Sequence, residues 1–349
     1  MSADDVGTRP PKRKLVSLDD SPLHTPSYTL NRHPEFWFDD GTIVLVLAQQ
    51  TGFRIYRGLL ASQSTIFADM LAASSSSSDE ILDECPVVQL ADSPQDLAHL
   101  LGVLLPTSPV HYHMSKADQP RSFDEVSAVI RLADKYHIES VLDHALRSLQ
   151  RYHFTSNFDA FSGPPDTEIS VEPIHAIGAV NLAHLTNTPR MLPLALYKCC
   201  YLDDDALLAG WKRADGTVEQ LTPTDLKRCS DARMPLLALH ASFHSRLFNQ
   251  LSLSPECPQS LSCAWVSGWM ADVLRSALPE RMVGFDVFHG WAKQLAALTK
   301  TRGLCEACVR LLMRRNWVDR GRIWDALPEV FGVAVEGWKS PEAGDSTGE

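Results

Sequence analysis

The sequence contains no long hydrophobic run, and positive charge is scarce in it. No apolar stretch approaches the roughly 18 residues that a membrane helix needs. Residues 1–20 are polar and charged, without an apolar segment of the signal-peptide type. We therefore expect an intracellular protein, nuclear or cytoplasmic, that does not bind membranes. The formal net charge of −11 gives the chain no bulk attraction to nucleic acid, so nucleic-acid binding would require a local basic patch.

Positive charge gathers in only two short clusters. Residues 12–14 form one, which would serve as a nuclear-import signal or as solvated charge in a flexible tail. The other consists of Arg314, Arg315, Arg320 and Arg322. No Cys₂His₂ finger or basic helix adjoins the N-terminal half, so direct reading of DNA is not expected.

The common catalytic motifs are also missing. The sequence has no G-x-S-x-G nucleophile elbow, no phosphate-binding G-x-x-x-x-G-K-[ST] loop and no dinucleotide G-x-G-x-x-G. His240 and His244 are four residues apart, but no glutamate follows the first, so the zinc-protease motif H-E-x-x-H is absent. No acid/base pair stands out either, and we do not expect an enzyme.

The chain is long enough for two or three domains. It has 349 residues, of which 44% are hydrophobic and 21% charged, ordinary values for a chain with a buried core. The pattern predicts a disordered tail over 1–33, an α+β domain with a short sheet over 34–153, and a linker over 154–170. An all-α region over 171–338 and a polar tail over 339–349 complete the prediction.

Within the first domain the periodicity changes along the chain. Residues 42–48 are continuously apolar and β-branched, as in a strand buried on both faces. Residues 49–52 predict a hairpin turn with its glycine. A second strand over 53–57 then runs directly into a helix. Ser93-Pro94 and the capping box Ser122–Glu125 predict two further helix starts, giving the order β-β-α-β-α-α-α.

The first domain resembles the BTB/POZ family. The resemblance rests on four segments in the family's order, Asp40–Val46, Phe53–Phe67, Val87–Leu90 and Leu132–Ile138. The second segment is similar to the family's strand-to-helix signature, although the usual His-Lys is here Tyr56-Arg57. The signature positions matched in this part of the chain are Asp40, Phe53, Tyr56, Arg57, Ala61, Ser62, Ser64 and Phe67. The layout of the whole chain resembles BTB proteins of mushroom-type fungi, which have a helical C-terminal region containing cysteines.

The resemblance implies a protein-interaction function. The family's domain usually dimerises through its N-terminal segment and first helix, which makes this chain itself or another BTB-type protein the expected partner. The apolar candidates for such an interface are Phe36, Trp37, Phe38, Leu59 and Leu60. An adaptor that binds a cullin scaffold of a ubiquitin ligase and a transcriptional regulator are alternatives within this class, and the helical region would be a second interaction surface.

The cysteines are the strongest chemical signal in the helical region. Cys305 and Cys308 form a C-x-x-C, and Cys257 and Cys263 precede them with five residues between. Four thiolates would hold a structural zinc ion, and His289 could replace one of them. The other interpretation is that these are small buried apolar side chains. A zinc-stabilised module or an enzyme in this region is the alternative of a different class.

Overall fold

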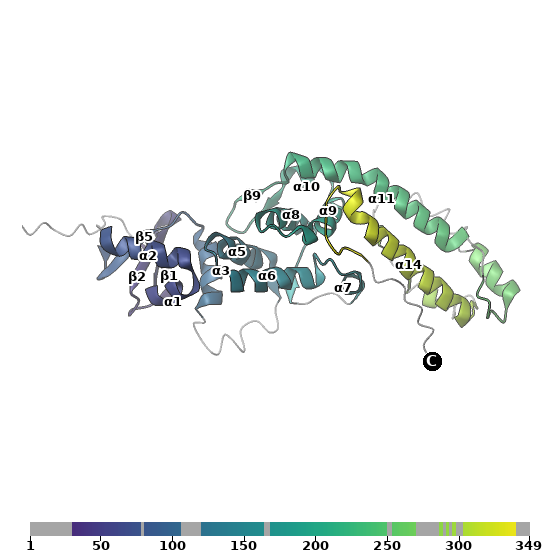
Figure 1. The fold of residues 1–349 in the computed structure, drawn as a ribbon, viewed down its shortest axis with the longest axis horizontal. Coiled ribbons are helices and arrows are strands. Elements are labelled where there is room, and N and C mark those ends of the chain that lie inside the picture. Colours follow the sequence, from purple (N-terminus) through teal and green to yellow (C-terminus); the bar gives the residue numbers. More distant parts are fainter. Residues whose placement is uncertain are drawn as a thin grey trace, which may run out of the picture. The chain divides into compact units, whose positions relative to one another are not determined.

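The computed structural model describes most of the chain between residues 30 and 339. The described ranges are 30–77, 80–105, 120–163, 168–249, 253–269, 286–288, 291–292, 295–297 and 303–339. A small N-terminal sheet is followed mainly by helices (Figure 1). This confirms the general prediction of a mixed α/β part ahead of a helical part.

The described residues divide into two compact units. One unit comprises residues from Met1–Arg57 and Asp69–Ala91, and the other residues from Gly58–Ala68 and Asp92–Glu349. The boundary between the two units does not fall in the predicted linker over 154–170. Residues 92–153, which precede this linker, belong to the same unit as the helices that follow it.

The first unit contains a five-stranded sheet. Its order is β1-β3-β2-β5-β4, where the strands are β1 Asn31–Trp37, β2 Ile43–Leu47, β3 Thr51–Ile55, β4 Ile81–Leu82 and β5 Cys85–Gln89. The predicted apolar strand is β2, and all five of its residues are buried. It pairs antiparallel with β3 and parallel with β5. Its continuous apolar run follows from this central position.

Two predictions about this sheet need correction. The predicted disordered tail ends too late, because β1 already begins at Asn31 and pairs in parallel with β3. Backbone pairing therefore orders a polar segment that has few apolar side chains of its own. The turn between β2 and β3 does not use the glycine either. Gln49 and Gln50 take the left-handed conformation, with φ of 59° and 56°. Gly52 instead lies within β3, where a Cβ would come within 2.4 Å of Leu30.

The helices have the bounds that follow. They are α1 Arg57–Gln63, α2 Thr65–Ser77, α3 Pro94–Leu104, α5 Phe123–Lys135, α6 Glu139–Tyr152, α7 Phe158–Ser162, α8 His175–Leu185, α9 Leu192–Cys199, α10 Asp204–Ala209, α11 Pro223–Asn249 and α14 Glu306–Val330. Residues 260–269 are also helical. Both predicted helix starts are confirmed. The hydroxyl of Ser93 accepts a hydrogen bond from the Asp96 N–H, and Ser122 with Glu125 forms the capping box.

The predicted all-α region, 171–338, contains one short hairpin, β8 Trp211–Lys212 with β9 Val218–Glu219, which corrects that prediction in detail. A second pair of two-residue strands, β6 Arg121–Ser122 with β7 Ile169–Ser170, lies before this region in the sequence. Strands of two residues are too short to produce an alternating hydrophobic pattern, so periodicity could not reveal them.

One hydrophobic core runs through the second unit. It contains Phe123 and Ile130 of α5 together with Ile177 of α8, Leu196 of α9 and Trp324 of α14. Trp324 is fully buried, and its ring stacks on that of Trp338 with centroids 4.6 Å apart. Helices from both sides of the predicted linker therefore fold around the same side chains.

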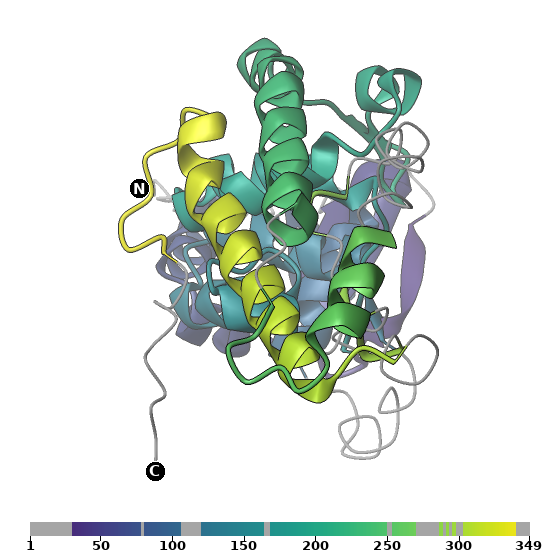
Figure 2. The same ribbon diagram turned by 90° about the vertical axis from the view of Figure 1, so that its right-hand side faces the viewer.

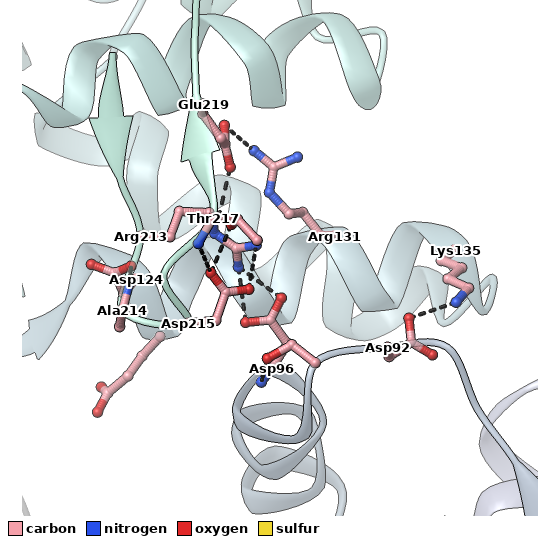
Figure 3. A network of polar contacts seen from close by, with 12 residues as sticks. Asp92, Asp96, Asp124, Arg131, Lys135, Arg213, Ala214, Asp215, Thr217 and Glu219 are labelled. Atoms are coloured by element: carbon pink, nitrogen blue, oxygen red, sulfur yellow. Dashed lines mark hydrogen bonds and ion pairs between the residues drawn. The ribbon is translucent and has the colours of Figure 1, made fainter. Parts of the chain in front are cut away.

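A buried charged network fixes the β8–β9 hairpin (Figure 3). The Arg213 side chain is 9% exposed, and its Nη2 donates to both carboxylate oxygens of Asp96 on α3, at 2.8 and 2.7 Å. Its Nη1 lies 3.3 Å from Asp215 Oδ2, and its Nε lies 3.5 Å from Glu219 Oε1. Three carboxylates thus surround one guanidinium that is almost excluded from water.

Two contacts extend the network to α5. Arg131 donates through Nη2 to Glu219 Oε2 at 2.5 Å. The backbone N–H of Ala214, in the hairpin turn, donates to Asp124 Oδ1 at 2.8 Å. Burial lowers the pKa of the Arg131 guanidinium, and the carboxylate of Glu219 opposes that shift. The hairpin is therefore attached by ion pairs to two helices that precede it by about ninety residues or more in sequence.

A half-buried lysine, Lys198, leads to a prediction about pH. The Nζ of Lys198 donates to the His153 carbonyl at 2.8 Å and lies 4.8 Å from the Phe154 ring centroid. Burial lowers the pKa of Lys198 from 10.5 to about 8. Between these values the unfolded chain binds a proton that the folded chain does not, so this residue makes the free energy of unfolding rise with pH, by at most about 1.4 kcal/mol per pH unit.

The measurement is urea unfolding at pH 7.5, 8.5 and 9.5 for the wild type and for Lys198→Met. The wild-type free energy of unfolding should rise more steeply with pH than that of the variant, because methionine keeps the apolar stem and removes the titrating group. Parallel curves for the two proteins would show that Lys198 is not the source of the effect.

Candidate functional site

The four predicted cysteines of the helical region come together. Cys257 lies in the segment before helix 260–269, Cys263 lies within that helix, and Cys305 and Cys308 lie at the start of α14. Their four sulfur atoms are all within 4.8 Å of one another. The described residues thus contain a cluster that could hold a metal ion. His289, the other ligand considered, lies outside the described residues.

Helix geometry explains how the C-x-x-C presents its sulfurs. Cys305 is the N-cap of α14, with extended backbone, and its Sγ accepts a hydrogen bond from the Cys308 N–H at 3.5 Å. The Cys305 N–H in turn donates to the Cys263 Sγ at 3.4 Å. The positive end of the helix and these N–H groups stabilise negative charge on sulfur. This end of α14 is therefore suited to thiolates.

The sulfur spacing matches the requirement of a tetrahedral metal. Zinc binds thiolate at about 2.3 Å, which places two ligand sulfurs of a tetrahedron about 3.8 Å apart. The Cys305 and Cys257 sulfurs are 3.7 Å apart. Cys263, Cys305 and Cys308 are buried and Cys257 is half-buried, so the cluster is closed on most sides. With four protein ligands, a tetrahedral ion would have no open position for substrate.

The thiols of the cluster differ in acidity. Burial raises the pKa of Cys305, but the N–H of Cys308 and the neighbouring thiol groups more than offset this, so its pKa falls to about 7. Burial raises the pKa of Cys263. Burial likewise raises the pKa of Cys308, to about 12. Without a metal, Cys305 therefore ionises more readily than Cys263 and Cys308, and a bound cation would favour the thiolate form of these two.

The remaining cysteines are structural by their surroundings. Cys199, Cys200 and Cys229 are buried in the core of the second unit. Cys85 is buried in the sheet, where its Sγ donates to the Gly41 carbonyl at 3.0 Å. This agrees with the usual burial of free cysteine.

In the first unit, two residues of the BTB-like signature meet. The Tyr56 hydroxyl donates to Asp40 Oδ1 at 2.6 Å, and this hydrogen bond is the main cause of the raised Tyr56 pKa. The backbone N–H of Arg57 donates to the Thr42 hydroxyl at 3.0 Å. Phe53 is fully buried. Tyr56, at the position where the family that the sequence resembles has histidine, therefore links the end of β3 to the turn between β1 and β2 through its hydroxyl.

In the second unit, two other signature segments meet. The Ser64 hydroxyl donates to the Tyr136 carbonyl at 2.5 Å, and both residues are buried. The Phe67 ring stacks on the Tyr136 ring with centroids 4.0 Å apart. Ala61 is half-buried, and the exposed Ser62 donates to the Leu59 carbonyl at 2.8 Å. The segment after α1 and the end of α5 are thus joined by a buried hydrogen bond and a ring stack.

The five interface candidates differ in accessibility. Phe36 and Leu60 are buried in the single chain, Trp37 and Phe38 are half-buried, and Leu59 is 48% exposed. Leu59 is therefore the candidate that offers the most surface to a partner in this conformation. The structure also shows functional side chains that the motifs missed. No sequence motif indicates that Asp96, in the first turn of α3, accepts hydrogen bonds from Arg213.

No protein-family model matches the chain, and a search of curated proteins finds no match either. Within the described residues, no helix combines the length and the apolar character needed to cross a membrane. The chemistry and geometry of the described residues are therefore the basis for assigning a function.

Proposed function

We propose that the chain is a protein-interaction subunit with a BTB/POZ-type N-terminal domain. The observation that carries this proposal is the contact between Ser64, Phe67 and Tyr136. Ser64 and Phe67 belong to one segment of the family resemblance and Tyr136 to another. Ser64 and Tyr136 are 72 positions apart in the sequence. A chance similarity of isolated segments would not be expected to bring signature positions into buried contact.

The exposed surface of α1 is the proposed route to self-association. Leu59 lies beside Gly58 and Ser62, which are also exposed, so a second copy can approach this face closely. Leu59 is 48% exposed, so covering the rest of its side chain would contribute about 1 kcal/mol on each side of a twofold interface. Leu60, which is buried on the same helix, would support this surface from within.

Size-exclusion chromatography with light scattering at micromolar concentration tests the proposal. The wild type is expected to elute as a dimer, and Leu59→Asp as a monomer, because a charge on this face cannot be buried without a partner. The matched control is Leu208→Asp. It makes the same substitution at another exposed leucine, which lies on α10. A wild type that remains strictly monomeric would overturn self-association.

We also propose a structural zinc ion in the helical region, as a second functional element. The spacing of the Cys257 and Cys305 sulfurs supports it, because 3.7 Å is the edge of a zinc–thiolate tetrahedron within about 0.1 Å. Cys263 and Cys308 would complete the ligand set. Such an ion would join the segment before helix 260–269 to the start of α14, with a stabilising rather than a catalytic role.

Elemental analysis of the purified chain tests this second proposal. About one equivalent of zinc per chain is expected, since one four-thiolate site holds one ion. A value below about half an equivalent, after purification without chelators and with zinc in the medium, would contradict it.

A further inference from the structure

Two long helices of the second unit enclose a groove rich in arginine. α11 and α14 run side by side in both views (Figures 1 and 2). The groove between them has a volume of about 420 Å³. It is lined by Arg246 of α11 and by Leu311, Arg314, Arg315, Val318, Asp319 and Arg322 of α14. We call this feature the arginine groove.

Its lining combines four guanidinium groups with a single carboxylate. Asp319 is buried, and its Oδ1 accepts from Arg246 Nε at 2.9 Å and from Arg322 Nη1 at 2.8 Å. One oxygen thus holds an arginine from each helix in place. A guanidinium has five N–H donors, so each of these arginines retains donors beyond its bond to Asp319. The Arg322 side chain is 60% exposed, and those donors are accessible.

The arrangement on α14 brings these charges to one face. Positions 311, 314, 315, 318 and 322 follow the spacing of one helical stripe. Arg320 belongs to the same basic cluster in the sequence but points elsewhere, with its guanidinium 5.6 Å from the Phe158 ring centroid. Like charges on one helix face are unfavourable by themselves. The lining of the arginine groove, with four arginines and one aspartate, is therefore locally positive in a chain of net charge −11.

We propose that the arginine groove binds an oxyanion of the phosphate class. A phosphate monoester carries nearly two negative charges and three terminal oxygens, which can accept hydrogen bonds from both helices at once. Arginine is the preferred residue for such groups, because its planar donor pairs match their oxygens. The volume of the groove is in the lower range for small-ligand sites, suitable for one phosphate group and the atoms that carry it. The bound oxyanion would be either the phosphate group of a phosphorylated side chain on a partner or a free phosphate ion.

Calorimetric titration of the full chain, at constant chloride concentration, tests the proposal. The probes are inorganic phosphate, a ten-residue peptide with one phosphoserine, and the same peptide without phosphate. Saturable binding is expected for phosphate or the phosphopeptide and absent for the unphosphorylated peptide. Arg322→Gln and Arg314→Gln should each weaken binding about tenfold, the effect of losing one charged hydrogen-bond donor.

The control variant is Arg310→Gln. Arg310 lies on the same helix and is 66% exposed, but it is outside the groove and faces Glu256 and Glu306. Its loss should change binding less than about twofold, within the effect of one distant exposed charge. Tighter binding of the phosphopeptide than of inorganic phosphate assigns the site to a phosphorylated partner, and similar binding assigns it to the free ion. The proposal fails if neither probe saturates at about 10 mM, or if Arg310→Gln weakens binding as much as Arg314→Gln.

Discussion

Replacing Cys305 and Cys308 together by serine should lower the free energy of unfolding by about 4 kcal/mol or more. This follows from the proposed zinc ion, since a ligand at a thousand times its dissociation constant stabilises the native state by about 4 kcal/mol. Structural zinc in small domains reaches on the order of 10 kcal/mol. Serine is close to cysteine in size, so the loss would come from the metal rather than from a cavity.

The measurement is denaturant unfolding with and without a chelator. The chelator should reduce the stability of the wild type to that of the double variant, and it should leave the double variant unchanged. Added zinc should restore the chelated wild type alone. A wild type whose unfolding midpoint responds neither to the chelator nor to zinc would show that the four thiols are no more than core side chains.

Replacing Arg213 by alanine should cost about 3–5 kcal/mol of unfolding free energy. The reason is the ring of carboxylates around this side chain, since Asp96, Asp215 and Glu219 would lose the guanidinium that compensates them. Removing one partner from a buried ion pair leaves uncompensated charge out of water, and measured costs are in this range. Loss of the β8–β9 hairpin should accompany the change.

The matched control is Arg147→Ala. Arg147 also pairs with an aspartate, Asp143, at 3.3 Å, but its side chain is 76% exposed and the pair lies on one helix. Exposed pairs of this kind contribute about 0.5 kcal/mol or less. Urea unfolding followed by circular dichroism measures both variants. If Arg213→Ala loses less than about 1 kcal/mol, the network contributes little to stability and water has access to it.

Local patterns predicted the local structure well. The buried strand β2 follows from its continuous apolar run, and the starts of α3 and α5 follow from Ser93 and from the capping box at Ser122. The cysteine spacing also selected the four residues whose sulfurs converge. The strand and the helix starts are determined by residues close together in the sequence. The cysteine cluster could be predicted because cysteine is itself a typical metal ligand.

Contacts between residues far apart in the sequence could not be predicted from local patterns. Asp96 and Arg213 are 117 positions apart, and no motif connects them. β1 is ordered by its hydrogen bonds to β3 rather than by its own side chains. Phe36 and Leu60 are buried, whereas Leu59 is exposed. This difference depends on how the helices and strands pack, and the residue type alone does not determine it.

The shared core of the second unit limits how this gene can be divided. A chain that ended near residue 153, at the edge of the apparent first domain, would keep Asp96 and Arg131 but lose Arg213 and Glu219. It would also expose apolar residues of α5 and α6 that now pack with α8 and α9. Such a fragment has the features of an aggregating polypeptide. Any division of the gene near codon 153 would therefore separate helices that bury one another's apolar side chains.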